Sequence, residues 1–179
     1  EWPDRHDNEI PFVVILNGTF SHTRDGECLL AHAPKRDALR RFAEILKSAG
    51  YASLRMDKVG YGESQLKDDW QGTYEDEAEV AKSAIKYVRQ LPNAGPIIVA
   101  GESAGAYIAC RSAKDGVEAD AYLFLAPYCA PGEELWEYNF GTVVRYAESS
   151  PQRMAWVRKA LRRELAIGRT YKGMWNAAK

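Results

Sequence analysis

Short, continuous runs of apolar residues alternate with segments of helical periodicity between residues 11 and 127. A run without polar alternation is typical of a strand buried on both faces. Strands that alternate with helices over short connections predict an α/β fold, a parallel sheet with helices on both faces. The clearest run is PFVVILN (11–17), and the other expected strands are YASLRMD (51–57), GPIIVAGE (95–102) and DAYLFLAP (120–127).

Three helices are expected between these strands. The segment 35–50 places Leu39, Phe42 and Leu46 at helical spacing and stops at Gly50, which suits a C-terminal cap. Thr73 and Asp76 have the spacing of a capping box and predict the start of the second helix. The third helix is expected over 103–113.

The sequence changes character after Pro131. We predict a core over 1–131, incomplete at both ends, and a helical lid over 132–179, which contains seven aromatic residues up to Trp175 and no convincing strand. Basic residues dominate from Pro151 onward. This basic segment is either a solvated helix face or a cap over a site for anionic substrates or an acidic partner.

Composition excludes several classes of protein. The net charge of −1 does not favour a nucleic-acid partner. The three cysteines are odd in number and show no metal-ligand spacing, so we expect no cysteine-bound metal and a reducing, cytoplasmic compartment. The chain has no apolar run near the ~18 residues of a membrane span and no signal-peptide pattern.

The stretch VAGESAGAYIA (99–109) carries the main chemical signal. It joins a buried strand to a helix through Gly101, Ser103 and Gly105, the G-x-S-x-G pattern of a nucleophile elbow. Small residues two positions before and after the serine are needed because the turn is strained. The alternative is a serine in an ordinary strand-to-helix turn.

With these surroundings, the chain resembles the α/β-hydrolase superfamily, in its branch of serine-peptidase-like, lipase-like and esterase-like enzymes with a helical lid. The resemblance covers roughly residues 10–130 and rests on three segments, VVILNGTF, GYASLRMDKVGYGES and IIVAGESAGAYIA. The first matches the family's oxyanion loop, although Asn17 replaces the usual histidine.

The resemblance implies a role for each matching residue. Ser103 would attack a carbonyl carbon, and the backbone N–H groups of Thr19 and Ala104 would form the oxyanion hole. One such donor typically contributes ~3 kcal/mol. Gly18, Gly101 and Gly105 would support the loop and the elbow. Glu102 would turn its side chain away from the pocket and bond nearby backbone.

Asp57, Gly60, Gly62 and Ser64 predict a turn beneath the site. Their spacing is only weakly suggestive of phosphate binding, because the third glycine of a phosphate-binding loop is absent.

The expected catalytic base is missing from the sequence after the elbow. In this fold the triad runs Ser, then Asp or Glu, then His, whereas His6, His22 and His32 all precede Ser103. His22 could lie near the site, but its place in the chain order argues against it as the base. Glu133 and Glu134 are candidates for the acid or are solvated loop residues.

Two explanations remain open. In the first, the sequence is part of a serine hydrolase that cleaves a small, partly hydrophobic ester, thioester or amide through an acyl-enzyme and needs no metal or organic cofactor. The rest of the hydrolase chain or a second subunit would then supply the histidine. A homodimer is a separate expectation. In the second, the chain is a catalytically silent binding module.

Overall fold

The computed structural model describes residues 1–3, 9–29, 34–66, 70–116, 119–127, 150–152 and 155. The chain separates into two compact units, Glu1–Pro127 and Tyr128–Lys179. The described part of the first unit contains β1 (Ile10–Leu16), α1 (Ala38–Ser48), β2 (Ala52–Arg55), α2 (Tyr74–Arg89), β3 (Ala94–Glu102), α3 (Ala104–Lys114) and β4 (Ala121–Leu125).

The four strands form one parallel sheet in the order β2-β1-β3-β4. In the middle of the sheet Val14 of β1 lies opposite Leu54 of β2 on one side and Val99 of β3 on the other. The predicted parallel sheet is confirmed. The second strand is shorter than the expected 51–57: the N–H of Tyr51 donates to the carbonyl of Leu46 at the end of α1, and Met56 and Asp57 lie beyond the strand.

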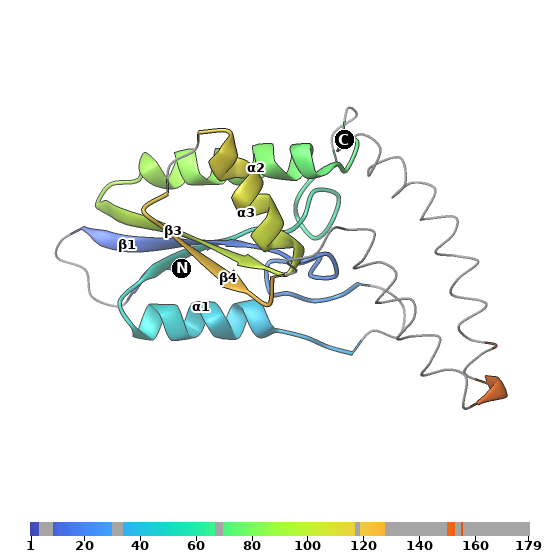
Figure 1. Ribbon diagram of the computed structural model, residues 1–179. Coiled ribbons are helices and arrows are strands. Elements are labelled where there is room, and N and C mark those ends of the chain that lie inside the picture. Colours follow the sequence, from blue (N-terminus) through green and yellow to red (C-terminus); the bar gives the residue numbers. More distant parts are fainter. Residues whose placement is uncertain are drawn as a thin grey trace. The chain divides into compact units, whose positions relative to one another are not determined.

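Helices cover both faces of this sheet, as predicted (Figure 1). Helix α1 packs on one face, where Leu39 and Ala43 join Val13 and Ile15 in a small core. Helices α2 and α3 pack on the other face and bury a larger core that includes Ile85 and Ile108. The alternating residues of β1 therefore serve two cores, which explains why the run 12–16 is apolar at every position.

The predicted start of α2 and the predicted end of α1 are both found in the structure. Thr73 accepts a hydrogen bond from the backbone N–H of Asp76, whose side chain accepts one from the N–H of Thr73, so the predicted capping box is formed. Gly50 follows α1 with a φ of +87°, and its N–H donates to the carbonyl of Lys47. A left-handed residue at this point is the usual glycine end of a helix.

The strand order fixes where a ligand can approach. From β1 the chain crosses to β2 on one side, and β3 then pairs on the other side of β1. The connections therefore diverge at the carboxyl ends of β1 and β3, and open α/β sheets bind ligands at such a switch point. The loop 17–27 and the β3–α3 turn meet here.

Strand β4 is an edge strand in the described part of the chain, and Leu123 and Phe124 are 40% and 43% exposed. The predicted lid over 132–179 lies outside the described residues, apart from 150–152 and 155, and stays a prediction. Across the described ranges, no helix combines the length and the apolar character needed to cross a bilayer.

Candidate active site

Ser103 occupies a strained turn between β3 and α3. Its φ of 52° and ψ of −113° lie outside the regions that a serine normally adopts. Two hydrogen bonds hold this backbone: the N–H of Ser103 donates to the carbonyl of Leu125 at 2.9 Å, and its carbonyl accepts from Ala106 at 3.0 Å. Strain of this kind persists only where surrounding structure fixes it, and it concentrates at functional sites.

The glycines on either side of Ser103 are required by space. A Cβ on Gly101 would lie 2.5 Å from the Cα of Ala106, and a Cβ on Gly105 would lie 2.7 Å from the carbonyl carbon of Leu16. Both contacts are with backbone, which cannot move aside without displacing α3 or β1. The G-x-S-x-G spacing thus follows from the close packing of the elbow against its neighbours.

A tight turn over residues 18–21 lies next to the elbow. The N–H of Ser21 donates to the carbonyl of Gly18 at 3.2 Å, which places Thr19 and Phe20 at the tip of the turn. Neither the N–H of Thr19 nor that of Ala104 donates a hydrogen bond to any described residue. The hydroxyl of Ser103 also has no hydrogen-bond partner in this part of the chain.

Asn17 anchors the start of this loop. Its side-chain amide donates to the carbonyl oxygens of Ser21, Thr23 and Met56 at 3.0, 2.9 and 3.2 Å. Asn17 is buried, so its amide depends on these carbonyl acceptors in place of water. Asn17 therefore ties the loop after β1 to itself and to the end of β2.

Glu102 contacts the same loop from the other side. One oxygen of its carboxylate, Oε2, accepts from the N–H of Gly18 and from the hydroxyl of Ser21, each at 2.8 Å. The bond to a nearby backbone N–H agrees with the expectation from the sequence. The bond to Ser21 had no signal in the sequence.

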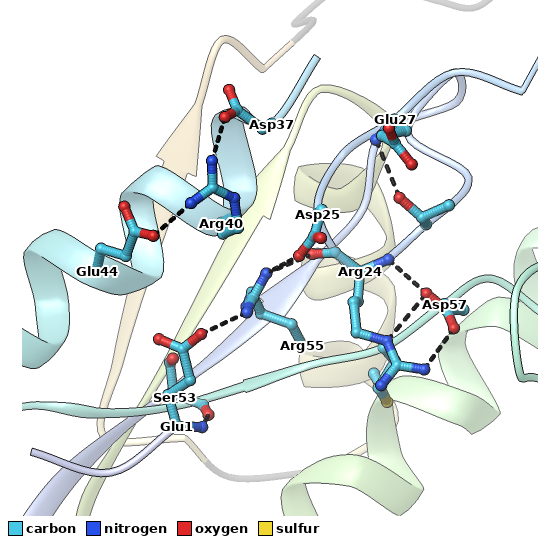
Figure 2. Close-up of polar contacts among 12 residues, drawn as sticks. Glu1, Arg24, Asp25, Glu27, Asp37, Arg40, Glu44, Ser53, Arg55 and Asp57 are labelled. Carbon is cyan, nitrogen blue, oxygen red and sulfur yellow. Dashed lines mark hydrogen bonds and ion pairs between the residues drawn. The ribbon is translucent and has the colours of Figure 1, made fainter. Parts of the chain in front are cut away.

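A second set of polar contacts joins the loop to the end of β2 (Figure 2). Arg24 places its Nη2 2.6 Å from Oδ2 of Asp57, and its backbone N–H donates to Oδ1 at 2.6 Å. A second ion pair has the charges exchanged: the acid, Asp25, is in the loop, and the base, Arg55, is in β2. The hydrogen bond from Arg24 and the N–H donors of Glu63 and Arg24 hold the pKa of Asp57 well below its usual range.

Asp57 also organises the predicted turn after β2. It accepts from the N–H of Glu63 at 2.9 Å, and the hydroxyl of Ser64 donates to its carbonyl at 2.8 Å. Gly60 and Gly62 both have positive φ, and a Cβ on Gly62 would collide with the carboxylate of Asp57. The four motif residues therefore build a turn around a buried carboxylate.

His22 is held in a structural position. It is 6% exposed, its ring stacks on that of Tyr61 at 4.4 Å, and its Nδ1 accepts from the N–H of Leu29 at 2.9 Å. Burial, together with the charges of Lys58 and Arg36, lowers the pKa of His22. No hydrogen bond joins it to Ser103. His6, His32, Glu133 and Glu134 lie outside the described residues.

The described residues offer no cluster of three or more histidine, cysteine, aspartate or glutamate side chains placed to hold a metal ion. Many polar side chains at this end of the sheet are instead bonded to one another or to backbone. The hydroxyl of Ser103 and the N–H groups of Thr19 and Ala104 have no such partner among the described residues.

The parallel sheet, its helices on both faces and the strained serine turn at the switch point define an α/β-hydrolase, as the sequence resemblance implied. More specifically, residues 32–176 match the serine aminopeptidase S33 family, and the chain belongs to that family. A search of curated proteins finds no match to the sequence.

Solved structures with a similar fold come from several organisms. Est1E from Butyrivibrio proteoclasticus, with ferulic acid bound, is 23% identical with a TM-score of 0.55, covering 71% of this chain and 47% of that one. The α/β-hydrolase GrgF from Penicillium sp. sh18 is 16% identical with a TM-score of 0.57, covering 81% and 47%.

An α/β serine hydrolase homologue from Coxiella burnetii is 21% identical with a TM-score of 0.53, covering 70% of this chain and 54% of that one. At these identities the likeness shows the fold alone. The chain spans about half the length of these structures.

Proposed function

We propose that this chain carries the nucleophile and the oxyanion hole of a serine hydrolase, with Ser103 forming an acyl-enzyme. The observation that supports this most strongly is the backbone of Ser103, whose φ of 52° is retained in a packed turn at the carboxyl end of β3. A strained serine with a free hydroxyl at a topological switch point suits a nucleophile better than a structural residue.

The proposed chemistry uses three groups. The Oγ of Ser103 attacks the carbonyl carbon of an ester, thioester or amide and gives its proton to a base. The N–H groups of Thr19 and Ala104 donate to the oxyanion as it forms. Water then attacks the acyl-enzyme, releasing the acid and restoring the hydroxyl of Ser103.

The base belongs to residues outside the described ones. The Nδ1 of His22 already accepts from Leu29, which leaves the proton of the neutral ring on Nε2, so His22 could act as a base only by giving up that bond. We therefore assign the base to the rest of the hydrolase or to a second subunit, and its carboxylate either to the same source or to Glu133 or Glu134 of this chain.

A partly hydrophobic substrate fits the described surface. Phe20 follows Thr19 directly at the tip of the 18–21 turn and is 56% exposed. Tyr61 and Leu66, in the turn after β2, are 39% and 66% exposed. These residues lie in the connections after β1 and β2, the edge of the sheet where Ser103 also lies. An apolar group on a small-molecule substrate could bury them.

Hydrolysis by the full-length protein tests this proposal. We expect p-nitrophenyl esters or amino-acid p-nitroanilides to be cleaved, with kcat lowered roughly 10⁴-fold or more in Ser103→Ala. Ser83→Ala, an exposed serine on α2, is the matched control and should keep wild-type rates. Hydrolysis that survives in Ser103→Ala would overturn the proposal.

The second candidate is a catalytically silent binding module. It is favoured by one observation: within the described residues no histidine is bonded to Ser103. Binding of substrate analogues to the full-length protein without any turnover or covalent labelling would support this alternative.

A further inference from the structure

We propose that Glu102 is a positioning residue that sets the oxyanion hole by holding both ends of the 18–21 turn at a fixed distance from the nucleophile. This inference rests on the proposed function, in which the N–H of Thr19 in the 18–21 turn donates to the oxyanion. The role is distinct from structural support of the elbow alone.

The carboxylate of Glu102 holds the turn at its first and last residues. Oε2 accepts from the N–H of Gly18, where the turn begins, and from the hydroxyl of Ser21, where it ends, each at 2.8 Å. The turn is closed internally by the N–H of Ser21 and the carbonyl of Gly18. Thr19, whose N–H is the proposed oxyanion donor, lies between the two held residues.

The fit between the turn and Glu102 is tight. A Cβ on Gly18 would lie 2.8 Å from Cδ of Glu102 and 2.9 Å from its carbonyl oxygen. Ser21 is only 3% exposed, so little water can replace the carboxylate as an acceptor for its hydroxyl. A buried donor that loses its acceptor is costly, so the two bonds stabilise one position of the turn.

Glu102 joins the turn to the nucleophile because it is the last residue of β3 and directly precedes Ser103. In the sheet, Leu16 at the end of β1 pairs with Gly101, one residue before Glu102. The connections then diverge, and the side chain of Glu102 bridges them just beyond the last paired residues. One residue thus sets the position of both the attacking oxygen and the Thr19 donor.

This geometry predicts an effect on turnover rather than on substrate affinity. A displacement of about 1 Å at a reacting centre can lower the rate roughly 10²-fold. In the full-length protein, we expect Glu102→Ala to lower kcat for a p-nitrophenyl ester roughly 30- to 100-fold with KM changed less than about threefold. Ser21→Ala removes one of the two bonds and should have a smaller effect in the same direction.

Two further variants separate positioning from a general loss of charge or stability. Glu102→Gln keeps a side-chain oxygen that can accept both bonds, so it should retain kcat within about fivefold of wild type. Glu44→Ala on α1 removes a carboxylate from an exposed pair with Arg40 and should keep wild-type kinetics. A uniform loss of activity in Glu102→Gln and Glu102→Ala would overturn the positioning role.

Amide hydrogen exchange measures the turn without reference to activity. In Glu102→Ala the amides of Gly18 and Ser21 should exchange at least roughly tenfold faster, while those of α1 are unchanged. Unchanged exchange at Gly18 and Ser21 would overturn the inference. Faster exchange with unchanged kcat would also overturn it, because the bonds would then be structural only.

The two proposals fail in different ways. A wild-type protein that neither turns over substrate nor reacts at Ser103 contradicts the proposed function. In such a protein, faster exchange in Glu102→Ala would still support Glu102 as the holder of the turn, and unchanged exchange would contradict that too.

Discussion

Arg24 and Asp57 form a fork-shaped ion pair across two loops, with the Nε and Nη2 of Arg24 at 3.2 and 2.6 Å from the two oxygens of the carboxylate. The two partners differ in burial: the side chain of Asp57 is 4% exposed and that of Arg24 is 43% exposed. The carboxylate therefore depends on its donors, whereas the guanidinium remains in contact with water.

This difference predicts unequal costs for removing either partner. Asp57→Asn should lower the free energy of unfolding by about 3 kcal/mol, because an amide nitrogen cannot accept the bonds that the buried carboxylate accepts. Arg24→Ala should cost less, about 1–2 kcal/mol, because the N–H groups of Arg24 and Glu63 still reach the carboxylate. Urea unfolding followed by circular dichroism measures both values.

The exposed ion pair on α1 provides the control. Arg40 pairs with Asp37 and Glu44 at the surface, and truncation of Arg40 should give a much smaller change than truncation of Arg24. Equal costs for Arg24→Ala and Arg40→Ala would contradict a structural role for the loop pair.

Substitution of an elbow glycine should lower both the stability of the protein and the reactivity of Ser103. Gly105→Ala would press a methyl group against the carbonyl of Leu16, and we expect it to lower the free energy of unfolding by about 3 kcal/mol and to displace Ser103. The labelling rate of Ser103 by a fluorophosphonate should fall in the protein that remains folded. Thermal unfolding and labelling can be followed on the same sample.

Gly50→Ala separates backbone strain from lack of space. Gly50 has a φ of +87° and no neighbour within 4 Å of an added Cβ, so this variant should cost about 1 kcal/mol and leave the labelling of Ser103 unchanged. A labelling loss in Gly50→Ala as large as that in Gly105→Ala would remove the steric explanation of the elbow.

The sequence predicted the parts of the fold that depend on local pattern. Apolar runs predicted the strands, and the pair Thr73 and Asp76 predicted a capping box that forms as expected. The turn around Asp57 was also predicted, from the spacing of its glycines. In the structure Gly60 and Gly62 adopt positive φ, and the carboxylate of Asp57 leaves no room for a side chain at Gly62.

Contacts between distant segments could not be predicted in the same way. The bond from Ser21 to Glu102 joins residues 81 positions apart, and neither residue type is unusual in a loop or at the end of a strand. Arg24 likewise carries no signal that distinguishes it from a solvated arginine. Such pairs follow from the strand order, which places the loop after β1 beside the end of β2 and the end of β3.

His22 predicts a dependence of stability on pH. Its pKa is lowered from 6.5 in the folded state, so the unfolded chain binds a proton more readily than the folded one in the range just below pH 6.5. The stability that His22 contributes is present above that pH and is lost as the pH falls toward the folded pKa. Protonation of Nδ1 would also break its bond with Leu29.

A variant that cannot titrate tests this effect. His22→Asn keeps an acceptor near the position of Nδ1, so its free energy of unfolding should change less between pH 7.5 and pH 5.5 than that of the wild type. The comparison is made by urea unfolding at both pH values. An identical pH dependence in both proteins would show that other groups, and not His22, cause the loss of stability in acid.

The most direct test of the central claim is the intact mass of the full-length protein before and after treatment with a fluorophosphonate probe. We expect a single adduct that maps to the peptide containing Ser103, is absent in Ser103→Ala and is unchanged in Ser83→Ala. A wild-type protein that gains no adduct, or one whose adduct persists in Ser103→Ala, would contradict Ser103 as the nucleophile of a serine hydrolase.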